Sequence, residues 1–177
     1  MARIRAIKPE AVEIIDVDEL CENGIMWDTA KIPAVVEKFR RVGIDALFLP
    51  FCDFGEEQVV AQIAGAFKVP TLVWGARDER PNSDEVRGRD TQCGMFAATK
   101  VLRRYGVKYS YIWNCETESD DFAKGYENFI RVAAVLKALK NLRVAKIGER
   151  PVPFMSVMTN EANLINRIGI TTVPISP

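Results

Sequence analysis

Residues 45–49 (DALFL) form a short, nearly continuous apolar run. Such a run is typical of a parallel strand that helices cover on both faces. A helical pattern follows over residues 55–67, and a second apolar run (VPTLVW) occupies residues 69–74. A strand, a helix and another strand in this order predict a parallel pair joined by a right-handed crossover.

The same alternation continues on both sides of this unit. Apolar periodicity predicts that Gly43 ends the helix at 29–42, with Thr29 as its cap and Pro33 in its first turn. We therefore expect a doubly wound, three-layer α/β/α fold with a mainly parallel sheet. The residues before Val12 are typical of a helix end, so we also expect that a first strand is missing. The other predicted strands are 12–17, 109–113, 143–148 and 170–175, and the other predicted helices are 90–105, 119–140 and 157–168.

The pattern restarts after Asn141, which suggests two domains. Residues 1–141 are predicted to form a Rossmann-like N-terminal domain. Residues 142–177 form a strand–helix–strand pattern that begins a second α/β domain or extends the first sheet. We favour the second domain, because the last predicted strand is followed directly by the end of the sequence.

Composition limits the possible partners. The 177 residues are 48% hydrophobic and 27% charged, with a formal net charge of zero. This composition is typical of a globular protein and gives no basic patch for nucleic acid or an anionic membrane. No apolar run is long enough to span a membrane, and no signal-peptide core precedes the first domain. The four cysteines lack a C-x-x-C spacing, so reduced thiols and a cytoplasmic location are expected.

The chain contains no histidine. This absence excludes Ser–His and Cys–His catalysis and histidine metal ligation within the chain. Neither G-x-G-x-x-G nor the P-loop pattern occurs, which argues against nucleotide binding. We therefore expect neither catalytic residues nor metal ligands here.

Polar residues gather where the predicted strands end, and ligands of open parallel sheets bind at that edge. We expect Cys52, Asp53, Trp74, Arg77 and Asn114 to lie together there and to contact a ligand, with Trp74 offering a ring face to a sugar. Each has a structural alternative. In these alternatives, Cys52 fills space in the core and Trp74 is a core residue. Asp53 and Asn114 instead cap the helices that follow them, and Arg77 forms salt bridges with neighbouring acids.

Several stretches of the chain resemble L-fucose isomerase-related proteins, of the L-fucose/L-arabinose isomerase superfamily. They are residues 45–57, 72–79, 89–96, 101–106 and 146–154. The resemblance extends from about residue 10 to the end of the chain. None of these motifs is a catalytic signature.

The resemblance implies a longer, three-domain subunit that interconverts aldoses and ketoses with a divalent metal, usually Mn²⁺. Its metal ligands lie in later domains and none maps onto this sequence. The first domain can contribute to a sugar pocket that a neighbouring subunit completes, through the loop after Leu49. Related enzymes can place a tryptophan in that loop, where this chain has Cys52 and Asp53.

The resemblance therefore implies a non-catalytic N-terminal fragment whose partners are a sugar, the remaining domains and other subunits of a homo-oligomer. One alternative is a sugar-binding module that resembles one lobe of a periplasmic-type receptor. Another is a domain that serves only subunit contacts.

Overall fold

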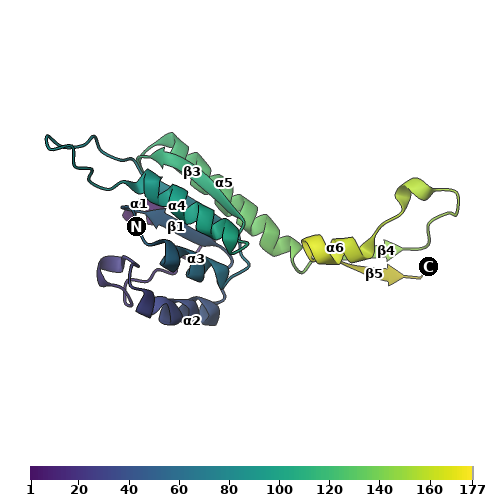
Figure 1. Ribbon diagram of the computed structural model, residues 1–177. Coiled ribbons are helices and arrows are strands. Elements are labelled where there is room, and N and C mark those ends of the chain that lie inside the picture. Colours follow the sequence, from purple (N-terminus) through teal and green to yellow (C-terminus); the bar gives the residue numbers. More distant parts are fainter. Residues whose placement is uncertain (177) are drawn as a thin grey trace. The chain divides into compact units, whose positions relative to one another are not determined.

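The computed structural model describes residues 1–176, which divide into two compact units, the first Met1–Ile130 and the second from Arg131 onwards. The first unit contains a parallel sheet of β1 (Leu47–Phe51), β2 (Thr71–Ala76) and β3 (Tyr109–Cys115), in that order (Figure 1). The predicted β-α-β alternation is thereby confirmed.

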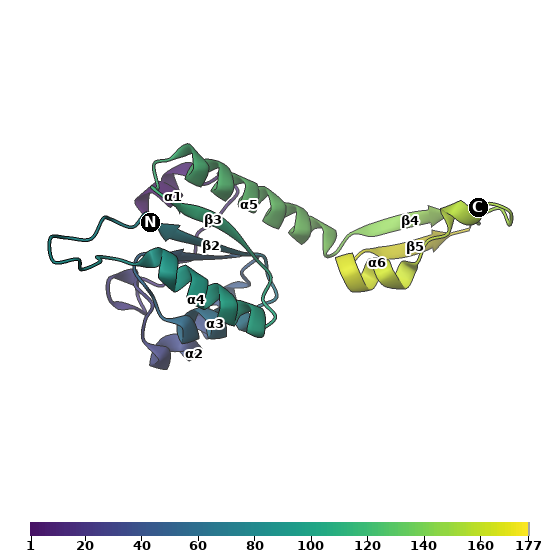
Figure 2. The same cartoon turned by 45° about the horizontal axis from the view of Figure 1, so that its top comes forward.

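Helices cover both faces of this sheet. On one face lie α2 (Ile32–Val42), α3 (Glu57–Gly65) and α4 (Thr91–Arg104). On the other face lie α1 (Ala2–Ile7) and the first part of α5 (Asp120–Leu139), as Figure 2 shows. The three layers confirm the predicted fold class.

Alternating side chains of β2 supply both cores. Val73 is fully buried beneath α3 and α4, whereas Leu72 and Trp74 point to the opposite face and pack with α1 and α5. Burying one such aliphatic side chain is worth roughly 1.5–3 kcal/mol, so apolar residues are favoured at every position of a strand with two covered faces. The core on the α5 side is completed by Ile4, Ile112, Phe122, Tyr126 and Phe129.

The start of α2 differs in detail from the prediction. Asp28, not Thr29, caps the turn that leads into this helix, because its carboxylate accepts a hydrogen bond from the Ala30 N–H at 2.9 Å. The expected roles of the other two residues are confirmed. Pro33 lies in the first turn of α2, and Gly43 ends the helix in a left-handed conformation with φ of 74°.

The prediction of a strand at residues 12–17 is wrong. Residues 12–17 have no regular secondary structure and pair with no strand within residues 1–176. The backbone carbonyl of Asp16 instead accepts a hydrogen bond from Lys38 Nζ at 2.6 Å, and its carboxylate pairs with Arg5. Ile15 and Val17 pack on the α2 side of the core. Their apolar pattern therefore reflects burial of a connecting segment.

The strands extend further than the apolar runs predicted. In register, Pro50 lies opposite Trp74 and Phe51 opposite Gly75, so the pairing continues past Leu49. Pro50 is tolerated because β1 is an edge strand of this sheet, where a missing N–H need not break a ladder.

The second unit has a sheet of its own. In it β4 (Arg143–Ile147) pairs in parallel with β5 (Thr171–Ile175), and α6 (Glu161–Ile168) lies between them in sequence. These strands do not extend the first sheet. The units divide after Ile130, inside α5, rather than after Asn141, and the assignment of residues 142–177 to a second domain stays a prediction.

The second unit buries very little. Ala133 is the one buried residue between positions 131 and 176. Ile147 is 76% exposed, and Phe154, Met155 and Ile165 are also exposed. Large contiguous apolar surfaces are uncommon on soluble monomers. No helix within residues 1–176 has the length and apolar character needed to cross a bilayer.

We expect this exposed apolar surface to make the isolated chain bind a hydrophobic dye and self-associate. The Ile147→Lys variant should lower dye fluorescence and shift analytical-ultracentrifugation profiles towards monomer, whereas Thr159→Lys, at an exposed polar position, should change neither. A wild-type chain that is monomeric and binds no dye would contradict this expectation.

A second expectation concerns Gly94 in α4, where a Cβ atom would overlap the carbonyl oxygen of Phe54. Gly94→Ala should destabilise the fold by about 1–3 kcal/mol in urea unfolding, because overpacking outweighs the gain in helix propensity. Cys93→Ala, at the exposed neighbouring position, should stay within about 0.5 kcal/mol of wild type. An unchanged or raised midpoint for Gly94→Ala would show that α4 does not need this close approach.

Candidate functional site at the carboxyl edge of the sheet

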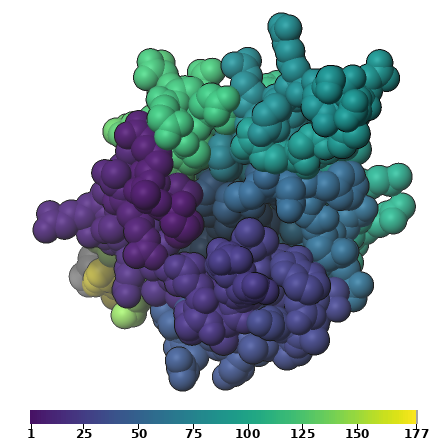
Figure 3. Space-filling view, turned by 90° about the vertical axis from the view of Figure 1, so that its left-hand side faces the viewer, coloured from purple at the N-terminus to yellow at the C-terminus, as the bar shows by residue number. Residues whose placement is uncertain are grey.

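The loops after β2 and β3 lie side by side at the carboxyl edge of the sheet. Figure 3 looks onto this edge, with the loop after β2 (teal) and the segment after β3 (green) along its upper rim. The β2–β3 register shifts between Trp74 and Ala76, so one extra β3 residue is accommodated there. A bulge of this kind re-aims side chains at a strand end. Here Asn114 reaches the start of α4, while Trp113 beside it is 71% exposed.

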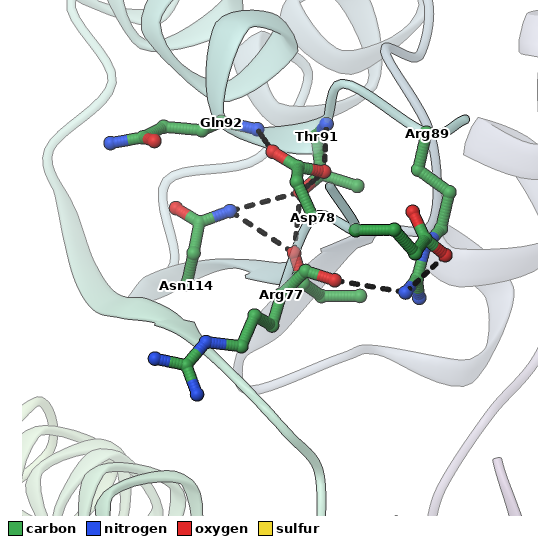
Figure 4. Close-up of polar contacts among 8 residues, drawn as sticks. Arg77, Asp78, Arg89, Thr91, Gln92 and Asn114 are labelled. Atoms are coloured by element: carbon green, nitrogen blue, oxygen red, sulfur yellow. Dashed lines mark hydrogen bonds and ion pairs between the residues drawn. The ribbon is translucent and has the colours of Figure 1, made fainter. Parts of the chain in front are cut away.

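Asp78 caps α4 from outside the helix. Its Oδ1 accepts hydrogen bonds from the Thr91 N–H at 2.7 Å and the Thr91 hydroxyl at 2.8 Å, and its Oδ2 accepts one from the Gln92 N–H at 3.0 Å (Figure 4). The residue directly before the helix, Asp90, has a left-handed φ of 54° and pairs with Arg87 instead. The β2 loop therefore supplies the carboxylate that the α4 N-terminus needs.

The buried Thr91 hydroxyl joins this cap to β3. It lies 2.5 Å from the Ala76 carbonyl oxygen and accepts a hydrogen bond from Asn114 Nδ2 at 2.9 Å. A hydroxyl has one proton, so it donates either to Ala76 or to Asp78 at any moment. A Cβ atom at Gly75 would lie 2.5 Å from Met95 Sδ and 2.8 Å from Asn114 Nδ2, so this contact needs glycine.

Arg89 fastens the far end of the loop. Its guanidinium donates to the Arg77 carbonyl oxygen at 2.9 Å and pairs with Glu79 at 2.5 Å. Hydrogen bonding to this guanidinium lowers the pKa of Glu79. The backbone of Arg77 is therefore held at two points, by Arg89 at its own carbonyl oxygen and by α4 through the neighbouring residue Asp78.

The pKa of Asp78 reflects a balance of opposing effects. Partial desolvation is the largest single influence and raises the pKa, but hydrogen bonds from Gln92 and Thr91, together with the Arg89 charge, lower it below its ordinary 3.8. Asp78 is therefore ionised at neutral pH, and its oxygens are occupied by protein donors.

A pocket of about 270 Å³ opens beside this cluster, lined by Arg77, Asp78, Gln92, Trp113 and Asn114. Figure 4 shows the Arg77 guanidinium and the side-chain amides of Gln92 and Asn114 on one side of the Asp78–Thr91 contacts. This arrangement offers a ligand hydrogen bonds from the guanidinium cation of Arg77 and from two neutral side-chain amides.

A larger hollow of about 420 Å³ lies along the N-terminal segment between Arg5 and Ile14. Its Arg5 side chain is already paired with Asp16, and its lining has no aromatic side chain. Because it also lacks residues from the strand ends, we place the candidate site at the carboxyl-edge pocket.

The structure brings together two of the five predicted site residues, Arg77 and Asn114. Asn114 does not cap α5, because Ser119 Oγ accepts from the Phe122 N–H at 3.2 Å. Within residues 1–176 the Arg77 guanidinium has no hydrogen bond or ion pair, so the alternative of a salt bridge with neighbouring acids is wrong.

Trp74 belongs to the core. It is 4% exposed, and its ring packs edge-on against Phe122 with centroids 4.9 Å apart. The expectation that Trp74 offers a ring face to a sugar is corrected by this packing: as an inner residue of β2 it points towards α5.

Cys52 and Asp53 follow β1 and do not line the pocket. Cys52 is an exposed free thiol rather than a buried filler. Asp53 accepts a hydrogen bond from the Gly55 N–H at 2.8 Å and so stabilises a turn. It does not cap α3, since Glu56 does so through the Gln58 N–H.

Trp113 and Gln92 were not among the predicted site residues. Trp113 was predicted only as the last residue of a strand. Tyr111 and Trp113 are exposed, and their rings contact each other edge-on at 5.4 Å, whereas Ile112 on the opposite face of β3 is buried. Alternation of aromatic residues with polar Ser110 predicts the reverse, with the aromatic face buried, so no signal in the sequence indicated an exposed aromatic at this edge.

The donor atoms at this edge do not converge on a common point. No group of three or more histidine, cysteine, aspartate or glutamate side chains converges within residues 1–176. The Asp78 oxygens are taken by N–H and O–H donors. These residues do not fit a Mn²⁺ site.

Fold and site together are those of an α/β domain with a polar pocket at the carboxyl edge of its parallel sheet. The fucose/sulfoquinovose isomerase N-terminal domain matches residues 1–140. The chain belongs to the fucose/sulfoquinovose isomerase family, of which it contains the N-terminal region.

Curated relatives point to the same family. The chain is 23% identical over 155 residues to a sulfoquinovose isomerase of Priestia megaterium, which covers 86% of this chain. A sulfoquinovose isomerase of Alkalicoccus urumqiensis is 25% identical over 134 residues and covers 73% of it. The chain spans about a third of the length of these relatives, 33% and 29% respectively.

We predict that Asp78→Ala destabilises the fold by about 0.5–2 kcal/mol, the usual cost of losing a helix cap. A folded-state pKa below 3.8 stabilises the fold above that pH, and this stabilisation is lost as pH falls through the lowered value. The difference in unfolding free energy between wild type and variant should therefore be constant near neutral pH and shrink only below about pH 4.

Asp84→Ala removes an exposed acid from the same loop and is the matched control. Equal effects of the two substitutions in urea unfolding, or a difference that persists undiminished into strong acid, would show that Asp78 does not stabilise α4 in this way.

Proposed function

We propose that this chain is the N-terminal, non-catalytic part of a sugar aldose–ketose isomerase of the fucose/sulfoquinovose type. The observation that carries this proposal is the family match over residues 1–140, joined to a polar pocket at the carboxyl edge of that same domain. The relatives' name, sulfoquinovose isomerase, supports a sugar as the substrate class.

The chemistry of aldose–ketose exchange explains why this part does not catalyse alone. A proton must move between adjacent carbons through an enediol, which requires a base beside the substrate and stabilisation of two neighbouring oxygens. The pocket offers a cation and two amides, and its carboxylate accepts hydrogen bonds from the N-terminus of α4. We assign the base and the Mn²⁺ ligands to later parts of a longer polypeptide.

The role left to this domain is to bind and orient the sugar. Asp78, Thr91 and Arg89 hold the two strand ends rigidly, so that Arg77 and Asn114 meet a ligand without reordering the backbone. Remaining domains and neighbouring subunits of a homo-oligomer are the proposed partners, and the cytoplasm is the proposed location.

We expect the isolated chain to convert no aldose to its ketose, with or without Mn²⁺. The assay would use sulfoquinovose, fucose and arabinose, with the full-length Priestia megaterium enzyme as positive control. Metal-dependent turnover by the isolated chain that survives repurification would contradict the proposal.

A chimeric enzyme provides a second test of the proposed function. Residues 1–140 of this chain would replace the matching domain of the Priestia megaterium enzyme. A folded, assembled chimera that isomerises sulfoquinovose supports the proposal. A chimera with native circular dichroism and native assembly but no activity counts against it.

A further inference from the structure

The two edges of the first sheet differ in how they are protected against pairing with another chain. β1 forms one edge and contains Pro50, which removes a backbone N–H that a further strand could use. β3 forms the other edge and pairs with no second strand beyond β2 within residues 1–176. Over Tyr109–Cys115 it contains neither a proline nor a charged residue. An edge of this kind is a template for a further strand, so β3 is open to a partner.

An exposed aromatic surface lies beside this open edge. Tyr111 is 54% exposed and its ring contacts that of the exposed Trp113, whereas Ile112 faces the core on the opposite side of the sheet. On α4, Phe96 is 65% exposed and lies one helical turn after Gln92, which lines the same pocket as Trp113. Aromatic side chains are enriched in protein–protein interfaces. The three exposed rings therefore favour a protein as the partner of β3.

The charges at the two ends of β3 are complementary to each other. Lys108 directly precedes the strand and Glu116 directly follows it, and both side chains are exposed. An antiparallel second copy of β3 brings the Lys108 end of each strand to the Glu116 end of the other, about a two-fold axis near Ile112. A parallel second copy brings like charges together instead. Two-fold association requires a self-complementary surface, and β3 has one in the antiparallel direction.

We propose that two copies of this chain associate by antiparallel pairing of their β3 strands, which joins the two sheets into one and places Tyr111 of each copy beside Trp113 of the other. Residues 109–112, which lie before the register shift, provide the regular part of the edge. Tyr111 is in register with Val73, so the rings of both copies lie on the α4 side of the joined sheet. The inference rests on the proposed function only in taking a neighbouring subunit as the partner.

The test is hydrogen–deuterium exchange of the full chain, followed by mass spectrometry over a range of protein concentrations. Ile147→Lys is the background, so that association through the second unit does not contribute. Peptides covering residues 108–116 should become more protected as the concentration rises, because the outward N–H groups of β3 become hydrogen-bonded. Peptides covering β1, the edge with Pro50, should show no such change and are the internal control.

Reversal of charge tests the direction of pairing. Lys108→Glu should raise the dimer Kd, measured by sedimentation equilibrium at low ionic strength, by about fivefold, because two contacts between opposite charges become repulsive. Adding Glu116→Lys to this variant should restore the wild-type Kd. Lys68→Glu is the matched control, since it makes the same change of charge at an exposed position outside β3 and should leave the Kd unchanged.

Tyr111→Thr tests the aromatic contact and keeps a residue type that is favoured in strands. The dimer Kd should rise by about tenfold, because each copy loses a cross-strand contact between aromatic rings. The circular-dichroism spectrum should stay that of the parent chain, since Tyr111 is exposed and is not part of either core.

Three results would overturn the inference. If residues 108–116 stay unprotected at every concentration, a second copy is not the partner of β3. If they are already fully protected in the monomer, the edge is covered within the chain. If Glu116→Lys does not restore association to Lys108→Glu, the strands do not pair in the antiparallel direction. None of these results bears on the isomerase role, because the activity of the assembled chimera tests that role separately.

Discussion

The contact between the Asp78 carboxylate and the first two N–H groups of α4 is the interaction on which the carboxyl edge depends. It joins the end of β2 to the start of a helix that lies thirteen residues further along the chain. Through the Thr91 hydroxyl it also reaches Asn114 at the end of β3. Two strand ends and a helix start are therefore held by one connected set of hydrogen bonds, and such networks rigidify a site when every member is satisfied.

Much of the fold was predictable because burial on both faces leaves a direct mark on sequence. The runs at 45–49 and 69–74 are strands for that reason, and Gly43 ends α2 as its position suggested. Residues 12–17 carry the same apolar mark without forming a strand, since hydrophobicity reports burial and says nothing about which partner takes the backbone hydrogen bonds. Strand ends were also misjudged, because pairing register is a long-range property.

The candidate site was predicted in part. Parallel strands present their carboxyl ends together, which correctly placed Arg77 and Asn114 at one edge. The same rule does not say which face a residue at a strand end points to, so Trp74 was chosen although the exposed ring belongs to Trp113. Asp78 was not among the predicted site residues, because its capping of α4 depends on a loop closure that no local pattern encodes.

Because of that loop closure, the length of the β2–α4 connection can change without changing the geometry of the sheet. Asp78 and Thr91 meet at its two ends, and Arg89 returns to the Arg77 backbone, so residues 80–88 form a closed excursion on a fixed base. The entropic cost of closing such an excursion rises only slowly with its length. Insertions or deletions at its tip would therefore leave the strand ends undisturbed, and the tip is the natural place to vary what borders the pocket by recombination or by engineering.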